Sequence, residues 1–598
     1  MFERSEIEGL ESNIDIWQSW LRPTPCACCS PIIGSLNNMM SISDELLGQI
    51  QHWQDKAPPL APIEVGVQLL VNARIYTVDA DFSICSGLAI ENGKVLATGD
   101  ADHLREQYPD ADLIDCEGKT ILPGFIEPHM HFLPIATIGQ FEDVGPFRFE
   151  QAEDALKHLT SLASALEEDE WLVARQFDPS LQEGAASLDK ELLDAVSTTN
   201  PVLVYNASLH FAYCNSKAME VAGIGRNTKD VQGSSYPRDA SGEPNGVLQG
   251  GYAISSVAKH NPGQRNYDLT DACLDVCKRA NAVGITTFCD QATGMSRGVK
   301  ELDLYQALSE SGRMSARLRY SLSYALQERW DATDARPGDG NEMARLTAWK
   351  IVSDGSNQGL SGLQREPYLN STERGAAYVQ ADDLVTMVKD RSARGWPLAI
   401  HANGDQAIDN VLDALEAADS EGLLQHGPYR IEHCSILHDE QIERIKKLGV
   451  SPSFLIGHVY YWGQAMRDKV FGLAKAELLD RTQACEQAGI RWTLHSDEPV
   501  SEMGPLRCIE NAVTRDLWKE PGSKLAAHEA ISVQAAIRAM TIDAAWQCHS
   551  DHEVGSLEVG KFADFVVLDA DPEEVASNKI SQISVLETWL EGRRVYES

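Results

Sequence analysis

The sequence predicts an α/β protein in which a long central region of alternating strands and helices lies between two strand-rich chain ends. Short apolar runs alternate with amphipathic segments along the middle of the 598-residue chain, a pattern typical of βαβ units and a parallel sheet. Both ends instead contain β-rich runs joined by turn residues such as Asn92-Gly93 and Glu591-Gly592. We therefore expect one small β-domain built from both ends and one large α/β domain inserted into it.

The elements follow in chain order from this division. Residues 1–64 are expected to form an N-terminal extension that ends in the Pro-rich join APPLAP. The β-domain is expected at 65–121 and 546–598, and the α/β domain at 122–545. A helix is expected at 382–395, where the sequence is amphipathic. Within the α/β domain, strands are expected at 121–131, 283–291, 347–355, 396–404, 429–434, 449–455 and 491–499.

Composition excludes several classes of protein. With 51 Lys+Arg against 89 Asp+Glu, the formal net charge is 51 − 89 = −38, which argues against a nucleic-acid-binding protein. No apolar run approaches the roughly 18 residues that a membrane span needs, and residues 1–20 lack the features of a secretory signal. The thirteen cysteines are odd in number, and we interpret them as reduced thiols of a soluble cytoplasmic protein. Cys26, Cys28 and Cys29 lie close together but lack a second Cys/His pair, so we interpret them as thiols of the extension.

The motif His129-Met130-His131 ends the first predicted strand of the α/β domain. Residues i and i+2 of a strand point to the same side, so the two imidazoles could bind one metal ion. Taken alone, such a pair is a weak signal, and a structural role is favoured over a metal site. Its meaning therefore depends on where other candidate ligands fall in the sequence.

Three further candidates follow the ends of predicted strands at barrel-like intervals. His401, His433 and Asp497 are separated by 433 − 401 = 32 and 497 − 433 = 64 residues. One βα unit of an eight-unit barrel takes about 31 residues, so these residues would follow the fifth, sixth and eighth strands. Barrel enzymes place their catalytic residues at these carboxyl ends of the strands.

Lys350 lies inside an otherwise apolar predicted strand, 401 − 350 = 51 residues before His401, where the fourth strand is expected. A buried ammonium group is costly unless it is paired or neutralised. Lys350 could form a salt bridge with a barrel carboxylate, or it could be carboxylated and bridge two cations. The interval 350 − 131 = 219 exceeds three βα units by about 125 residues, which predicts an insertion at about 140–270.

Ordered motifs give the chain a resemblance to a known family. It resembles the amidohydrolase superfamily, specifically the amidohydrolase-3 group of YtcJ-like proteins, from about Leu69 to about Tyr596. This resemblance implies a distorted (β/α)8 TIM barrel with a metal centre and a small β-sandwich domain formed from both chain ends. The motifs that carry it include LPGFIEPHMH at 122–131, HFAYCNSKAMEVAGI at 210–224, WKIVSDGS at 349–356, HANGDQAID at 401–409, RIEHC at 430–434, SDEPV at 496–500 and GSLEVGKFADFVVLD at 555–569.

The resemblance also implies roles for the strand-end residues. His129 and His131 would bind one metal ion with Asp497 beside it, His401 and His433 would hold a second, and Lys350 would bridge them if carboxylated. Zn²⁺ is the first expectation for one or two ions, with Mn²⁺ and Fe²⁺ as alternatives. Asp497 would accept a proton from the attacking water and pass it to the leaving amine.

Other residues are candidates for binding the substrate. His210 matches a group motif and would contact the substrate carbonyl, although a structural role fits it nearly as well. The segment 451–463 departs from the plainer strand and loop expected there. His458, Tyr461 and Trp462 in that segment could line the substrate pocket, or they could be ordinary core residues.

These observations favour a metal-dependent hydrolase of a C–N bond other than a peptide bond, in an amide or N-acyl amine. One alternative is a deaminase or cyclic-amide hydrolase of the same superfamily, and another is a non-catalytic regulatory homologue. We expect a small-molecule substrate and neither a nucleic-acid nor a membrane partner. The sequence leaves the oligomeric state open, with a homodimer as one option.

Overall fold

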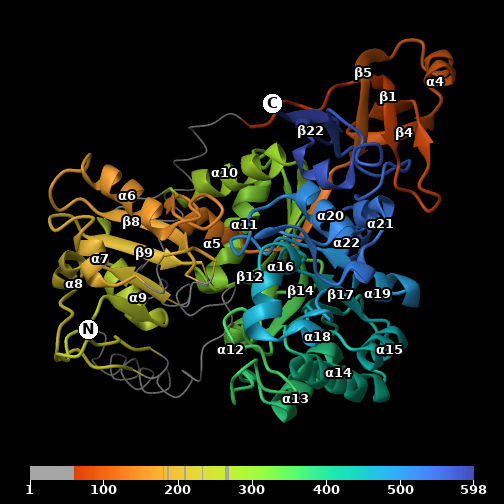
Figure 1. Ribbon diagram of the computed structural model, residues 1–598. Coiled ribbons are helices and arrows are strands. Elements are labelled where there is room, and N and C mark those ends of the chain that lie inside the picture. The colour runs from red at the N-terminus through yellow and green to blue at the C-terminus, as the bar shows by residue number, and fades with distance from the viewer. Residues whose placement is uncertain (1–58, 180, 185–187, 208–210, 232–233, 263–267) are drawn as a thin grey trace, which may run out of the picture. The chain divides into compact units, whose positions relative to one another are not determined.

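The computed structural model describes residues 59–179, 181–184, 188–207, 211–231, 234–262 and 268–598 (Figure 1). Cys26, Cys28, Cys29 and most of the expected extension at 1–64 lie outside these residues. No helix of the described residues is long and apolar enough to cross a membrane. The chain divides into two compact units, which we describe separately: the larger comprises the described residues of Ile42–Thr137, Asp268–Gly294 and Gly298–Ser598, and the smaller those of Ile138–Tyr267 with Met295–Arg297.

Both chain ends contribute to one eight-stranded sheet of the larger unit. Its hydrogen-bonded order is β23-β22-β21-β5-β1-β3-β4, and β2 pairs with β1. One face buries an apolar cluster that includes Leu70, Ile90 and Phe565, and α4 (Ala101–Gln107) packs against the cluster that contains Leu69 and Val71. The expected joining of the two ends is confirmed, while their packing as a sandwich stays a prediction. The strands are β1 (Val67–Tyr76), β2 (Ile84–Cys85), β3 (Gly87–Glu91), β4 (Lys94–Gly99), β5 (Asp112–Pro123), β21 (Phe565–Leu568), β22 (Val585–Leu590) and β23 (Arg593–Glu597).

The two turns expected in this sheet are present as two-residue hairpin loops. Asn92 and Gly93 connect β3 to β4, with φ values of 52° and 76°, and Glu591 and Gly592 connect β22 to β23, with 52° and 67°. Positive φ at both central residues is the geometry that fits the right-handed twist of the flanking strands. Local turn chemistry therefore sets the register of both hairpins.

Eight parallel strands of the larger unit form a nearly closed barrel. Their hydrogen-bonded order is β6-β12-β13-β14-β15-β16-β17-β18, which is also their order along the chain. The expected (β/α)8 fold is confirmed, and its later strands are short. The strands are β6 (Phe125–Met130), β12 (Ile285–Thr293), β13 (Arg317–Ser323), β14 (Ala344–Val352), β15 (Leu398–Ala402), β16 (Arg430–His433), β17 (Ser451–Phe454) and β18 (Thr493–Leu494).

Helices follow the strands and pack their apolar sides on the barrel. The helix expected at 382–395 is confirmed as α13 (Ala381–Ala393), which buries Leu384 and Val388. The other principal helices of the larger unit are α5 (Phe132–Ile138), α10 (Leu269–Ala282), α11 (Glu301–Glu310), α14 (Asp405–Ser420), α15 (Asp439–Leu448), α19 (Thr482–Ala488), α20 (Pro505–Thr514), α21 (Val533–Ala539) and α22 (Ile542–Gln547).

Gly124 joins the terminal sheet to the first barrel strand. It lies between β5 and β6, and a Cβ atom at this position would lie 2.2 Å from Oγ1 of Thr286. Its N–H donates to the carbonyl of Asp564 at 2.9 Å, and the N–H of Phe125 donates to the carbonyl of Gly284 at 2.9 Å. Only glycine permits this close approach, which leads the chain directly into the strand that carries His129.

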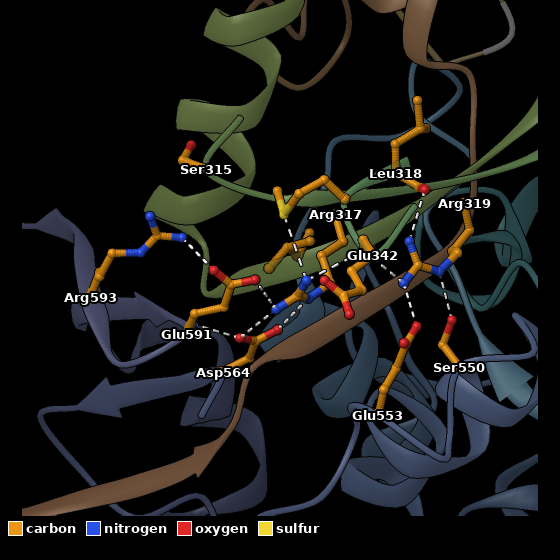
Figure 2. Close-up of polar contacts among 12 residues, drawn as sticks. Ser315, Arg317, Leu318, Arg319, Glu342, Ser550, Glu553, Asp564, Glu591 and Arg593 are labelled. Atoms are coloured by element: carbon orange, nitrogen blue, oxygen red, sulfur yellow. Dashed lines mark hydrogen bonds and ion pairs between the residues drawn. The ribbon is translucent and has the colours of Figure 1, made fainter. Parts of the chain in front are cut away.

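The barrel strand β13 was not predicted from the sequence. Its sequence RLRYSLS places Arg317 and Arg319 in a strand whose seven residues are all buried, whereas buried strands are normally apolar. Both guanidinium groups are paired inside the protein (Figure 2). Arg317 Nε lies 2.8 Å from Asp564 Oδ2, and Arg319 Nη2 lies 2.7 Å from Glu553 Oε1. Because both partners come from the C-terminal part of the chain, local sequence could not reveal this strand.

The same network connects the barrel to the terminal sheet. Arg317 also pairs with Glu591, in the β22–β23 turn, at 3.0 Å, and its guanidinium lies 4.0 Å from the centre of the Phe562 ring. Arg319 Nε donates to Ser550 Oγ at 2.6 Å. Buried charges of this kind are tolerated only when they are paired and hydrogen-bonded, so each arginine depends on residues more than 200 positions away.

The smaller unit has its own five-stranded sheet, in the order β11-β10-β9-β8-β7, with apolar clusters built around Leu203 and Val204. Asn215 begins a helix of this unit, since its side chain accepts a hydrogen bond from Ala218 N. The domain boundaries predicted from the sequence stay predictions. The elements are β7 (Glu142–Asp143), β8 (Leu172–Phe177), β9 (Val202–Asn206), β10 (Phe211–Cys214), β11 (Val247–Gln249), α6 (Ala152–Ala163), α7 (Lys190–Asp194), α8 (Ser216–Ala222) and α9 (Gly251–Ala258).

Replacing Arg319 by methionine should destabilise the larger unit. The substitution leaves Glu553 with one fewer cationic partner and Ser550 without its donor, and breaking a buried ion pair typically costs about 3 kcal/mol. The measurement is the urea midpoint of Arg319→Met against the wild-type protein. Arg105→Met, which removes an exposed pair with Asp102, is the control and should leave the midpoint unchanged. Equal midpoints for all three proteins would contradict the importance of this network.

Candidate metal centre

The barrel brings the predicted strand-end residues together. His129 lies near the end of β6, Lys350 in β14, His401 in β15 and His433 at the end of β16, and Asp497 follows β18. His131, one residue beyond β6, belongs to the same group, and all six side chains are buried. The strand numbers one, four, five, six and eight are those expected from the spacing of the sequence.

Local backbone geometry orients two of these residues. His433 and Asp497 have φ values of 65° and 56°, in the left-handed region that few non-glycine residues adopt. Such conformations cost free energy and cluster at functional sites, where the surrounding structure holds them. His433 is the last residue of β16, and Asp497 comes three residues after the end of β18.

Asp497 lies at the centre of the cluster. Its Oδ1 atom is 3.0 Å from His131 Nε2 and 3.4 Å from His129 Nε2, and its Oδ2 atom is 3.9 Å from His433 Nδ1. The rings of His401 and His433 have their centres 4.5 Å apart. Two sets of three side chains have ligand atoms within 4.8 Å of one another: His129, His131 and Asp497, and His129, His433 and His495.

The donor atoms of this cluster fit a cation. Both ring nitrogens of His131, both of His433 and Oδ1 of Asp497 are buried and have no hydrogen-bond partner among the described residues. Such atoms are costly to bury unless something satisfies them. Nitrogen and carboxylate oxygen together are the usual ligands of zinc and related transition metals. The residues present therefore form a His/Asp cluster that could bind a metal.

Two histidines of the cluster, His129 and His433, have a pKa well below the ordinary value for histidine. Burial lowers the pKa of His129 well below its ordinary value, and the nearby charge of Lys350 lowers it further. Burial likewise lowers the pKa of His433, with His401 and His495 adding to the effect. A neutral imidazole has a free lone pair, and this is the form that binds a metal ion.

Lys350 and His401 lie at the edges of the cluster. Lys350 is fully buried, with Nζ 3.3 Å from His129 Nε2. His401 Nε2 lies 3.2 Å from the carbonyl oxygen of Gly355 and 3.3 Å from Asp354 Oδ1. Lys350 thus lies beside His129, and its two expected roles, a salt bridge to a barrel carboxylate and a carboxylated bridge between cations, stay predictions.

His458 and its aromatic neighbours approach the cluster from the loop after β17. His458 is the second residue of the short helix α16 (Gly457–Tyr460), and its Nδ1 lies 3.3 Å from Ser435 Oγ. Burial lowers the pKa of His458 to about 4, Asp497 opposes this shift, and His401 adds to it. Rings of His458 and Trp462 have centres 6.0 Å apart, and those of Tyr461 and Trp462 are 5.9 Å apart. The segment therefore forms an aromatic group next to the histidines.

One expected residue lies outside the described part of the chain, and two other polar residues make hydrogen bonds away from the cluster. His210 lies outside the described residues. Asp290, within β12, accepts hydrogen bonds from Tyr305 and Thr293 and from the N–H of Phe132. Arg238 donates to three carbonyl groups of its own loop, so it builds the smaller unit.

Sequence reasoning missed three polar residues of the barrel interior. Glu432 accepts from His129 Nδ1 at 2.6 Å, and Arg430 pairs with Glu432 at 2.7 Å. His495 stacks on His129 with ring centres 4.6 Å apart. All three lie within or beside the motifs RIEHC and SDEPV, and charged residues inside a strand predicted to be buried were the available signal.

Known proteins share this fold and much of this sequence. The amidohydrolase family matches residues 112–596, and an imidazolonepropionase-like composite domain of bacteria matches 87–111. An N-substituted formamide deformylase of Arthrobacter pascens is 28% identical over 88% of this chain and 98% of that protein. The putative amidohydrolase YtcJ of Bacillus subtilis (strain 168) is 26% identical over the same shares of the two chains.

Solved structures support the fold. An uncharacterised metal-dependent hydrolase of Pyrococcus horikoshii OT3 superposes with a TM-score of 0.67 at 21% identity, covering 86% of this chain and 99% of that one. A corresponding protein of Pyrococcus furiosus gives 0.66 at 24% identity, covering 85% and 100%. The family match spans most of the sequence and includes every residue of the His/Asp cluster. The chain therefore belongs to the amidohydrolase family and is a hydrolase that acts on carbon–nitrogen bonds.

Proposed function

We propose that this protein is a metal-dependent hydrolase of small non-peptide amides. N-acyl amines, which include N-substituted formamides, are the first substrate class that we propose. The observation that carries this proposal is the buried cluster of His129, His131, His433 and Asp497. In it, both ring nitrogens of His131 and His433 and Oδ1 of Asp497 have no hydrogen-bond partner among the described residues. N-substituted formamides are included in this class because the deformylase relative aligns with this chain over almost its whole length.

In this proposal His129, His131 and Asp497 would hold one cation, His401 and His433 would hold a second, and Lys350 would bridge the two if carboxylated. Zn²⁺ is proposed, with Mn²⁺ and Fe²⁺ as alternatives, since imidazole and carboxylate ligands suit all three. When bound, the cation supplies Lewis acidity and makes water nucleophilic at neutral pH. We also propose that the protein is cytoplasmic, and this proposal is based on the sequence alone.

Asp497 is proposed to move the proton. Its Oδ1 atom has no hydrogen-bond partner among the described residues, so it is available to accept a proton from the attacking water. The water oxygen then bonds to the carbonyl carbon, the C–N bond breaks, and Asp497 returns the proton to the leaving nitrogen. The products are a carboxylic acid and an amine.

The loop after β17 is proposed to receive the substrate. His458 is buried and neutral at physiological pH, so it can donate or accept one hydrogen bond to a polar substrate atom. Tyr461 and Trp462 offer apolar surface for an N-substituent. A carbonyl contact from His210 is part of the same proposal and rests on the sequence motif.

A substrate panel tests the reaction class. Zn²⁺-loaded protein should release amine from at least one N-formyl or N-acyl amine, and it should lose this activity on chelation and recover it when Zn²⁺ is restored. Amine release is measured for N-formyl, N-acetyl, carbamate and cyclic-amide compounds. Turnover confined to cyclic amides or to deamination would favour the alternative chemistry, and full activity after chelation would remove the metal from the mechanism.

Asp497→Asn should nearly abolish turnover, with kcat falling by about 10²–10⁴, because an amide cannot accept the proton. Bound metal and the urea midpoint are measured on the same samples, so loss of a ligand is separated from loss of the base. Asp405→Asn changes another buried acid, paired with Lys475 and His438, and should cost stability while keeping turnover. Near-wild-type rates for Asp497→Asn would exclude its role in proton transfer.

Lys350→Ala should selectively lower the occupancy of a second metal ion, because it removes the proposed bridge. Metal per chain is measured by elemental analysis after loading and desalting. Lys475→Ala removes a lysine of another barrel loop, which pairs with Asp405 at 2.8 Å, and should leave the ratio unchanged. If Lys350→Ala bound as much metal as the wild-type protein, the bridging role would be wrong.

A further inference from the structure

Arg430 and Glu432 are buried charged residues to which the proposed reaction assigns no task. Both lie in β16, and their side chains are 2% and 0% exposed. A buried ion pair rarely stabilises a protein more than apolar residues of similar size would. Their presence within a barrel strand therefore calls for a reason other than stability, and their contacts supply one.

Glu432 sets the protonation pattern of His129. Its Oε2 atom lies 2.6 Å from His129 Nδ1, and a carboxylate can only accept, so Nδ1 carries the hydrogen. A ring that carries its one hydrogen on Nδ1 has its lone pair on Nε2. That atom lies 3.4 Å from Asp497 Oδ1, so the lone pair is on the side of the metal-binding cluster.

His131 and His433 have no such anchor. Neither nitrogen of either ring is hydrogen-bonded among the described residues. Their orientation must come from packing and from the backbone, which at His433 has a φ of 65°. His129 is thus distinguished from these two histidines by a charged partner on the nitrogen that faces away from Asp497.

Arg430 holds both the carboxylate and the chain beside His129. Its Nε lies 2.7 Å from Glu432 Oε1, and its Nη2 donates to Glu432 Oε2 at 3.1 Å. The same Nη2 donates to the carbonyl oxygen of Pro128 at 3.0 Å, one residue before His129. Burial alone would lower the pKa of Arg430, but the charge of Glu432 outweighs it and the pKa is raised.

We propose that Glu432 and Arg430 are positioning residues of the metal centre: Glu432 fixes the tautomer and ring orientation of His129, and Arg430 fixes Glu432 and the backbone at Pro128. This inference rests on the proposed metal-dependent function. Glu432 Oε2 accepts from both His129 Nδ1 and Arg430 Nη2, and Oε1 lies beside Arg430 Nε. A glutamine with its oxygen at the Oε2 position would place an NH₂ group against Arg430 Nε, which is also a donor.

Binding of Co²⁺ alone tests the proposal, since its visible absorption reports the coordination geometry. Glu432→Gln should weaken Co²⁺ affinity by about 10–100-fold, as loss of a carboxylate behind a histidine ligand does elsewhere, and should change the absorption spectrum. Affinity is measured by competition with a chelator on full-length protein. Arg430→Lys, which keeps the charge but loses the planar fork, should shift affinity in the same direction.

Arg319→Met is the matched control, since it breaks another buried Arg–Glu pair of the barrel at 2.7 Å. It should lower the urea midpoint while leaving Co²⁺ affinity and absorption as in the wild-type protein. If Glu432→Gln and Arg430→Lys behaved like this control, with stability alone affected, the pair would be structural and the proposal would be overturned.

A double substitution tests whether Glu432 acts through His129. In a His129→Ala background, Glu432→Gln should change Co²⁺ affinity by less than about twofold, because the ring that it positions is gone. A further tenfold loss in that background would overturn the proposal. A wild-type protein that bound no Co²⁺, Zn²⁺ or Mn²⁺ would instead overturn the metal-dependent function, and this inference with it.

Discussion

The polar contacts that join the last barrel strand to the first are the constraint on which the rest of the site depends. β6 and β18 are the two ends of the hydrogen-bonded strand order. The gap between them is crossed by Ser496, whose N–H and hydroxyl donate to Glu127, and by the N–H of His131, which donates to the carbonyl of Glu498. Asp497 lies between Ser496 and Glu498, so barrel closure itself carries this carboxylate to the imidazoles of β6.

Closure also explains why the cluster is poor in hydrogen bonds of its own. Backbone groups and the Ser496 hydroxyl make the hydrogen bonds that connect the two strands. Among the described residues, Asp497 Oδ1 and the ring nitrogens of His131 therefore have no hydrogen-bond partner. Burial lowers the pKa of His129 and His433, because desolvation disfavours the charged form. Imidazole nitrogens beside one carboxylate form a donor set that could bind a cation.

The sequence was sufficient for those parts of the fold and site that local patterns encode. Asn92-Gly93 and Glu591-Gly592 specify their hairpins by backbone preference, and the intervals from Lys350 to His401, His433 and Asp497 follow from the length of a βα unit. These intervals predicted the strand numbers on which the residues are found. Their roles as ligands, bridge and base stay predictions.

Long-range charge pairing was the part that local patterns could not encode. Arg317 and Arg319 made β13 look unlike a buried strand, because Asp564 and Glu553, which neutralise them, come more than 200 residues later. Glu432 escaped notice for the same reason: its partner His129 is 303 residues away. A charge inside a predicted strand is interpretable only once the fold identifies its partner.

The two sets of buried arginines differ in what their carboxylate partners touch. Asp564 and Glu591 accept hydrogen bonds from Arg317, and Glu591 lies in the β22–β23 turn of the terminal sheet. The network of Arg317 therefore connects only structural elements. Glu432 accepts hydrogen bonds from both Arg430 and His129. The network of Arg430 therefore ends at an imidazole whose other nitrogen lies 3.4 Å from Asp497. The cost of burying the charges is of the same kind in both places. What each network holds in position distinguishes them, and by that criterion Arg317 serves the fold whereas Arg430 serves the site.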